Sequence, residues 1–292
     1  MHVMNTAKET YNLSYGAHPL QKMDVHFPEG YSASTPITFL IHGGGFIAGQ
    51  KEDFTTQAAL MCREGFVTVN LSHRLVDTDG LYRNPPLHRA GSVKITDQLA
   101  DVAAAVNAFS AQAAVWGLGA GRMYMAGHSA GAILAMLYVQ GASNNDGHIQ
   151  ASGNWAGSTD LSLPADTIYN YLPPPERKQI MELYYRGTGY EPLTANNSAF
   201  RTISPIWAAD ENGGRPNISI YPEHNVVSCF PQEEISGLEN TRKFHELLRS
   251  RGIAEQLHVY PGADHGFHTP ADVWQRCIRE TAGFFRMTTG MA

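Results

Sequence analysis

A serine flanked by glycines is the residue of this sequence with the clearest chemical role. Ser129 stands in the middle of Gly127–Gly131, which reads Gly-His-Ser-Ala-Gly and fits the pattern G-x-S-x-G. The motif follows a short apolar run, Arg122–Ala126, and precedes a helical run, Ile133–Gln140. A sharp strand-to-helix turn needs small flanking residues, and it brings the serine hydroxyl and the next N–H to the positive end of a helix. The spacing therefore predicts a nucleophilic serine beside a site for developing negative charge.

A glycine run lies upstream of this serine. His42–Phe46 reads His-Gly-Gly-Gly-Phe and directly follows the apolar run Ile37–Ile41. Residues without a Cβ let the backbone approach a substrate closely and direct N–H groups into a site. A phosphate-binding loop is the alternative, but the sequence has neither a P-loop pattern nor a dinucleotide-binding glycine pattern.

A histidine late in the chain is the candidate general base. His265 follows the apolar run Gln256–Tyr260 and a Pro-Gly turn, so it is expected just after the last strand. A serine followed much later by a histidine is the order of an α/β-hydrolase triad. His268 is the nearest competitor. Position, rather than residue type, favours His265, because the chain contains 13 histidines.

The elements that must position these residues alternate between strand and helix. Strands are expected at Ile37–Ile41, Phe66–Leu71, Arg122–Ala126, Ile149–Ala156, Ile218–Tyr221 and Gln256–Tyr260, and helices at Asp53–Arg63, Ser92–Ala114, Glu239–Arg251 and Asp272–Phe285. Repeated strand–helix units predict an α/β fold, in which helices cover both faces of a mostly parallel central sheet. The Pro-, Gly-, Asn- and Tyr-rich stretch 158–216 breaks the rhythm, and we expect a small cap-like insert there or a decorated surface connection.

With these motifs in this order, the chain resembles the α/β-hydrolase superfamily. It is most similar to the hormone-sensitive-lipase-like and acetyl-xylan/feruloyl-esterase-like carboxylesterases that carry His-Gly-Gly-Gly-Phe. The resemblance covers nearly the whole chain and implies the α/β-hydrolase fold. It also implies an oxyanion hole formed by the N–H groups of Gly44, Gly45 and Ala130, with His42 supporting the glycine loop.

The acid of the triad departs from that family's pattern. No Asp occurs between Asp210 and Asp264, and Asp264 adjoins His265, from where the in-plane contact to Nδ1 is rarely reached. Glu can replace Asp, and Glu223, just past the strand Ile218–Tyr221, is the predicted acid. The alternatives are Glu233 and Glu234 in the nearby loop, and Asp160 after an earlier strand.

These residues predict a carboxylic ester hydrolase that uses Ser129, His265 and Glu223 and forms an acyl-enzyme without a cofactor. We expect short-acyl esters or small aromatic and sugar esters as substrates. An amidase or arylformamidase would share all of these parts, and a hydrolase-fold binding protein without catalysis is a further alternative. The second alternative is disfavoured because the sequence retains both the serine and the histidine.

Composition limits the remaining possibilities. The chain has 292 residues, of which 43% are hydrophobic, and a formal charge of −6. One domain spanning 1–292 is expected, and the mild acidity disfavours nucleic acid as a partner. No apolar stretch reaches the length of a membrane span, and the polar start lacks a secretory signal, so a cytoplasmic location is expected. Three scattered cysteines and the absence of zinc-binding spacing predict neither disulfides nor a metal, and a homodimer stays open as the assembly state.

Overall fold

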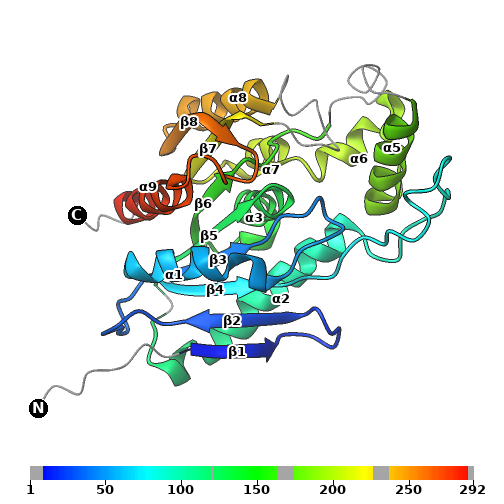
Figure 1. Ribbon diagram of the computed structural model, residues 1–292. Helices are drawn as coiled ribbons and strands as arrows, with labels where there is room; N and C mark the ends of the chain where they lie inside the picture. The colour runs from blue at the N-terminus through cyan, green and yellow to red at the C-terminus, as the bar shows by residue number, and fades with distance from the viewer. Residues whose placement is uncertain (1–8, 120, 163–173, 226–236, 289–292) are drawn as a thin grey trace, which may run out of the picture.

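The computed structural model describes residues 9–119, 121–162, 174–225 and 237–288. Within these residues eight strands form one sheet in the order β1-β2-β4-β3-β5-β6-β7-β8 (Figure 1). The first two strands run antiparallel to their neighbours, and the strands from β4 to β8 are parallel. The strands are β1 (Glu9–Ser14), β2 (Lys22–His26), β3 (Ile37–Ile41), β4 (Val67–Leu71), β5 (Met123–His128), β6 (Ile149–Trp155), β7 (Asn217–His224) and β8 (Glu255–Asp264). The predicted α/β-hydrolase fold is confirmed.

Helices follow the strands along the chain. The α-helices are α1 (Thr55–Arg63), α2 (Ile95–Ala113), α3 (Ala130–Gln140), α5 (Pro174–Thr188), α6 (Asn197–Arg201), α7 (Pro205–Asn212), α8 (Leu238–Ser250) and α9 (Val273–Thr288). Short 3₁₀ turns lie at Lys51–Phe54, Ala114–Trp116, Ala142–Asn144 and Thr194–Asn196. Each helix predicted outside the insert is present among the described residues, within a few residues of its expected bounds.

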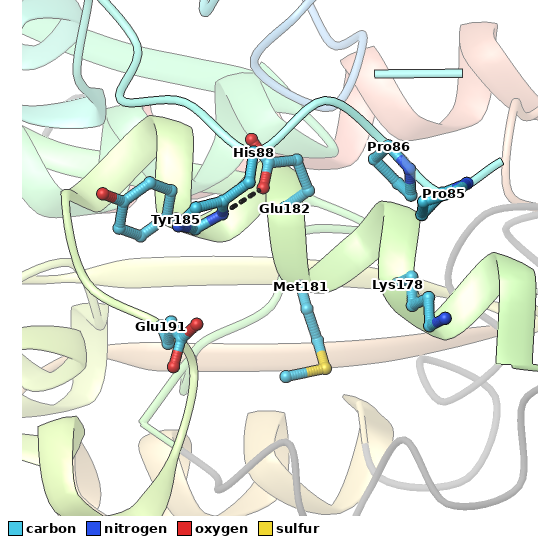
Figure 2. Close-up of a pocket in the computed structure, with 8 residues that line it drawn as sticks. All are labelled: Pro85, Pro86, His88, Lys178, Met181, Glu182, Tyr185 and Glu191. Atoms are coloured by element: carbon cyan, nitrogen blue, oxygen red, sulfur yellow. Dashed lines mark hydrogen bonds and ion pairs between the residues drawn. The ribbon is translucent and has the colours of Figure 1, made fainter. Parts of the chain in front are cut away.

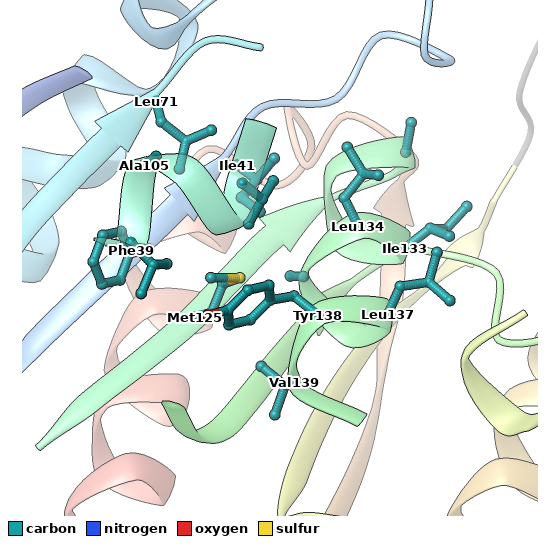
Figure 3. Packing of buried hydrophobic residues seen from close by; sticks show 14 of the residues in the cluster. Phe39, Ile41, Leu71, Ala105, Met125, Ile133, Leu134, Leu137, Tyr138 and Val139 are labelled. Carbon is teal, nitrogen blue, oxygen red and sulfur yellow. The ribbon is translucent and has the colours of Figure 1, made fainter. Parts of the chain in front are cut away.

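Both faces of the sheet are covered because its central strands are apolar on both sides. In β3 the side chains of Ile37, Phe39 and Ile41 pack with α2 and α3, whereas Leu40 belongs to the cluster formed with α1 and α9. Figure 3 shows part of the first cluster, where Met125 lies beside Tyr138 of α3, and Phe39 packs against Phe109 of α2. Strands buried on both faces read as continuous apolar runs, which is why their positions could be predicted.

Helix α5 belongs to the stretch predicted as an insert and is held to the loop after β4 by a buried arginine. Arg186 is fully buried, and its Nε donates to Glu182 at 2.8 Å. Its two terminal nitrogens donate to the backbone carbonyl groups of Asp77, Asp79 and Leu87. A buried guanidinium needs this many acceptors to offset its lost hydration. The network therefore fixes the position of α5, which carries one wall of the pocket described below.

Candidate active site

The nucleophile turn joins the end of β5 to the start of α3. Ser129 has φ 53° and ψ −124°, a strained conformation for a residue with a side chain. Its N–H donates to the carbonyl of Trp155 on the neighbouring strand at 2.9 Å, and its own carbonyl accepts the N–H of Ala132 at 3.0 Å. These bonds hold the strained turn in place, and strain of this kind is common at functional sites.

The two glycines of the serine motif are required by close backbone contacts. A Cβ on Gly127 would lie 2.4 Å from the carbonyl oxygen of Gly131. A Cβ on Gly131 would lie 2.2 Å from the carbonyl oxygens of both Ile41 and His42. Larger residues would therefore separate α3 from β3 and displace Ser129.

The glycine loop lies directly against the nucleophile turn. A Cβ on Gly43 would meet Nδ1 of His128 at 2.9 Å and Cβ of Ser129 at 3.2 Å. Gly44 has φ +111°, and a Cβ there would lie 2.2 Å from the carbonyl oxygen of Ala48. The glycines thus permit a backbone path that brings main-chain N–H groups to the serine.

Three N–H groups predicted for the oxyanion hole lie around this contact. They belong to Gly44, Gly45 and Ala130, and none of them donates to another residue in the described part of the chain. Ala130 begins α3, so its N–H is one of those that a helix leaves unsatisfied at its first turn. The side chain of His42 lies beneath the loop, stacked on His73 with ring centroids 4.5 Å apart.

His265 follows β8 and lies beside the nucleophile turn. Its Nδ1 is 2.5 Å from Oδ1 of Asn225, which comes immediately after β7. Its backbone carbonyl accepts a hydrogen bond at 2.6 Å from Nε2 of His128, the residue before Ser129. His265 and Ser129 both line one pocket. The predicted base and nucleophile therefore line the same pocket. Sequence reasoning missed the two residues that contact His265, His128 and Asn225.

The prediction that Glu223 lies against His265 is wrong. The Glu223 carboxylate accepts the N–H of Gly262 at 2.7 Å, and its side chain is 52% exposed. β7 pairs Pro222 with Tyr260 and His224 with Asp264, and the register shift between these pairs brings Asn225, and not Glu223, level with His265.

The alternative acids do not contact His265 either where the structure describes them. Oδ1 of Asp160 accepts hydrogen bonds from the N–H and the hydroxyl of Ser162, so this carboxylate organises its own loop. Glu233 and Glu234 lie outside the described residues. An amide rather than a carboxylate is therefore the described neighbour of Nδ1.

The pocket above Ser129 is small and mostly apolar. It measures about 380 Å³ when counted to its open mouth. Tyr184 of α5 forms one wall, and it is held by an edge-to-face contact with Phe200 of α6. The lining residues are Gly45, Phe46, Ser129, Ala130, Ile133, Ala156, Ser158, Leu161, Tyr184 and His265. An acyl group attached to Ser129 would meet Tyr184, Ile133 and Leu161.

A second pocket lies on the adjacent side of α5 (Figure 2). Tyr185 lines it and stacks on His88, with ring centroids 4.3 Å apart. Nδ1 of His88 is 2.8 Å from the Glu182 carboxylate. Because successive helical residues point in different directions, Tyr184 and Tyr185 serve separate pockets.

Comparison with known proteins places the chain in a family. The model of the BD-FAE family matches residues 23–182, more than half of the chain. The chain belongs to the BD-FAE family. No curated protein matches it.

Solved structures show the same fold as this BD-FAE member at low sequence identity. A truncated carbohydrate esterase from gut microbiota aligns with a TM-score of 0.71 and 17% identity, over 97% of this chain and 96% of that one. An inhibited esterase B from Lactobacillus rhamnosis gives 0.72 and 13%, over 99% and 89%. A thermophilic esterase from Thermogutta terrifontis with butyrate bound gives 0.66 and 20%, over 98% and 95%.

Two kinds of feature are absent from the described residues of this BD-FAE chain. They contain no group of three or more His, Cys, Asp or Glu side chains arranged to hold a metal ion. None of their helices is both long enough and apolar enough to cross a membrane.

Several histidines of this BD-FAE member have a lowered pKa because they are removed from water. Burial lowers the pKa of His265 to about 3, a direction that the neighbouring His128 reinforces and the Asp264 carboxylate opposes. Burial also lowers the pKa of His128 to about 4 and that of His73 to about 3. The pKa values of His42 and His245 are lowered by the same cause. These imidazoles are therefore neutral in the folded protein at pH 7, as a general base must be.

We expect these histidines to make the fold acid-sensitive. Their pKa in the unfolded chain is about 6.5, so below that pH the unfolded state binds protons that the folded state does not. As the pH falls through this range, each histidine should lower the free energy of unfolding by about 1.4 kcal/mol per pH unit, until the pH reaches the pKa of that histidine in the folded state. Urea unfolding at pH 7, 6 and 5 measures this slope. An unfolding free energy that is constant between pH 6.5 and 5 would contradict the expectation, because carboxylates titrate mainly below that window.

Proposed function

We propose that this chain is a serine carboxylic ester hydrolase that acts on short-acyl or small aromatic and sugar esters. The observation that carries the proposal is the strained Ser129 turn, packed against a glycine loop and sharing a pocket with His265. Family membership supports it, as do the structural neighbours, which include a carbohydrate esterase and an esterase with bound butyrate.

The proposed reaction uses groups of this chain alone. Nε2 of His265 accepts the proton of the Ser129 hydroxyl while Oγ attacks the ester carbonyl carbon. The electron pair of the carbonyl moves to its oxygen, and the N–H groups of Gly44, Gly45 and Ala130 stabilise that oxyanion. The tetrahedral intermediate collapses, and the leaving alcohol takes the proton from His265. Water, deprotonated by the same imidazole, then attacks the acyl carbon. The second tetrahedral intermediate breaks its bond to Oγ of Ser129, which takes the proton back from His265, and the carboxylic acid leaves.

Labelling with an alkyl phosphonate tests the proposal directly. A phosphonate reports an activated serine without requiring knowledge of the natural substrate. We expect stoichiometric labelling of Ser129, identified by mass spectrometry of its peptide, together with hydrolysis of p-nitrophenyl acetate. Comparison of kcat/KM on a matched ester and anilide separates an esterase from an amidase. Absence of labelling would favour a binding protein instead.

Short acyl chains should be preferred. Tyr184, Ile133 and Leu161 close the pocket above Ser129, and its volume of about 380 Å³ leaves no long apolar channel among the described residues. Each methylene that finds no apolar contact forgoes about 0.8 kcal/mol of binding. Across p-nitrophenyl esters from acetate to palmitate, kcat/KM should peak between acetate and hexanoate. A steady rise to palmitate would show that the pocket opens into a long tunnel.

A matched pair of variants on α5 sharpens that measurement. Tyr184→Ala removes a wall of the pocket and should move the optimum to longer acyl chains. Tyr185→Ala changes the neighbouring pocket and should leave the profile unchanged. Equal profiles for the two variants would show that Tyr184 does not limit the acyl group.

A further inference from the structure

The residue against the proposed catalytic histidine is a neutral amide. Resting on the function proposed above, we propose that Asn225 positions His265, so that the general base of this enzyme is oriented by an amide and not by a carboxylate. The contact between Nδ1 of His265 and Oδ1 of Asn225 is 2.5 Å long. Asn225 is 1% exposed, so this contact is shielded from water.

The amide of Asn225 makes a second hydrogen bond on its other side. Nδ2 donates to the hydroxyl of Tyr221 at 2.8 Å, and Oδ1 faces His265. Because an amide oxygen can only accept, Nδ1 of His265 must carry the proton. Nε2 then keeps its lone pair, and this is the tautomer that can take a proton from Ser129.

The described charged groups near His265 contact other partners or are exposed to solvent, and do not touch its ring. The carboxylate of Glu223 is bonded to Gly262, and the carboxylate of Asp264 accepts the N–H of His268. From β5, Nε2 of His128 donates to the backbone of His265 and not to its ring. The side chains of Glu223, His224 and His268 are more than half exposed. Among the described residues, no carboxylate therefore touches the imidazole.

The amide has a chemical consequence that a carboxylate would not have. A carboxylate stabilises the imidazolium ion and raises the histidine pKa, whereas an amide only fixes the tautomer. Burial lowers the pKa of His265 to about 3, and no anion on Nδ1 offsets it. His265 is therefore a weak base, and its imidazole stays neutral in mild acid. The acid limb of kcat/KM should therefore coincide with acid unfolding and not with an independent titration of His265.

Two substitutions at Asn225 separate positioning from packing. Asn225→Ala removes the acceptor, and we expect kcat to fall by about 10- to 100-fold, the usual cost of a lost hydrogen bond to a group that becomes charged. Asn225→Asp keeps the acceptor and adds a charge. It should keep kcat at pH 8 within about tenfold of wild type and raise the pKa of His265 by at least about one unit, since an adjacent carboxylate typically contributes 1–3.

The readouts include one that does not depend on turnover. Nitrogen NMR of the histidine rings should show His265 protonated on Nδ1 alone at pH 7 in the wild type. Titration should show His265 of Asn225→Asp gaining its second proton while the chain is still folded by circular dichroism, whereas His265 of the wild type should gain it only on unfolding. The matched controls are Glu223→Gln, Glu233→Gln and Glu234→Gln, each of which should keep the wild-type kcat.

The outcomes distinguish this inference from the proposed function. If Ser129 is labelled but Asn225→Ala keeps full kcat, or one of the three Glu→Gln variants collapses, the function stands and the role of Asn225 is refuted. An unchanged His265 pKa in Asn225→Asp, or wild-type His265 protonated on Nε2 alone, refutes it as well. If Ser129 is not labelled, the NMR measurement still decides whether Asn225 sets the tautomer.

Discussion

Replacement of Ser129 by alanine should lower kcat for ester hydrolysis by about 10⁴- to 10⁶-fold, the range found when the nucleophile of a serine hydrolase is removed. Ser158 also lines the pocket, but its φ is not positive, so Ser129 is the lining serine with a strained backbone. The substitution removes one oxygen and leaves the glycine contacts around the turn in place. The loss should therefore arise from chemistry and not from unfolding.

The measurement needs a control for contaminating esterases. Wild type and Ser129→Ala should be purified in parallel, compared on p-nitrophenyl acetate, and checked by thermal unfolding for an unchanged midpoint. A residual rate above a hundredth of wild type in a preparation that cannot be labelled by phosphonate would show that another residue is the nucleophile.

Replacement of Gly44 by alanine should be the next most damaging change. Its φ of +111° disfavours any side chain, and the added methyl group would lie 2.2 Å from the carbonyl oxygen of Ala48. The loop must then shift and carry the N–H groups of Gly44 and Gly45 with it. Loss of one oxyanion donor typically lowers kcat by about 10²- to 10³-fold.

A second glycine provides the control for backbone strain. Gly65 also has a positive φ, of +84°, but a Cβ there would meet nothing within 4 Å. Gly65→Ala should therefore destabilise the fold by about 1–2 kcal/mol through strain alone and leave kcat unchanged. If Gly44→Ala is folded and turns over ester at the wild-type rate, the glycine loop does not form the oxyanion hole.

The sequence was informative wherever local chemistry decides the structure. The run Ile37–Ile41 is apolar because both of its faces are buried, and it coincides with β3. The turn around Ser129 needs small residues within a few positions, so the motif alone predicts it. Both signals are contained in a handful of consecutive residues.

The partner of His265 was missed because it depends on how two distant segments align. A register shift between β7 and β8 decides which residue after Tyr221 faces His265. Neither segment has a local sequence pattern that predicts this shift. In addition, an amide oxygen accepts the same hydrogen bond as a carboxylate oxygen, so Asn is a candidate partner as well as Asp and Glu. An Asn at the end of a strand, in a loop that lacks Asp, was the available signal.

Strand β1 and helix α5 were missed for a different reason. Glu9–Ser14 lies at the edge of the sheet and is largely exposed, so it lacks an apolar pattern. Pro174–Thr188 carries polar residues over its exposed side and begins within a proline run, which resembles a loop. Its position is set by the bonds of Arg186 to the loop after β4, which no local pattern encodes.

The place of β8 at the edge of the sheet has a consequence for how the protein becomes active. The proposed nucleophile and the glycine loop follow strands in the middle of the sheet, whereas His265 follows β8, which among the described residues pairs only with β7. His265 cannot reach Ser129 before β8 docks. During refolding, hydrolysis should therefore not return before β8 has joined β7, whatever the order in which the other elements form.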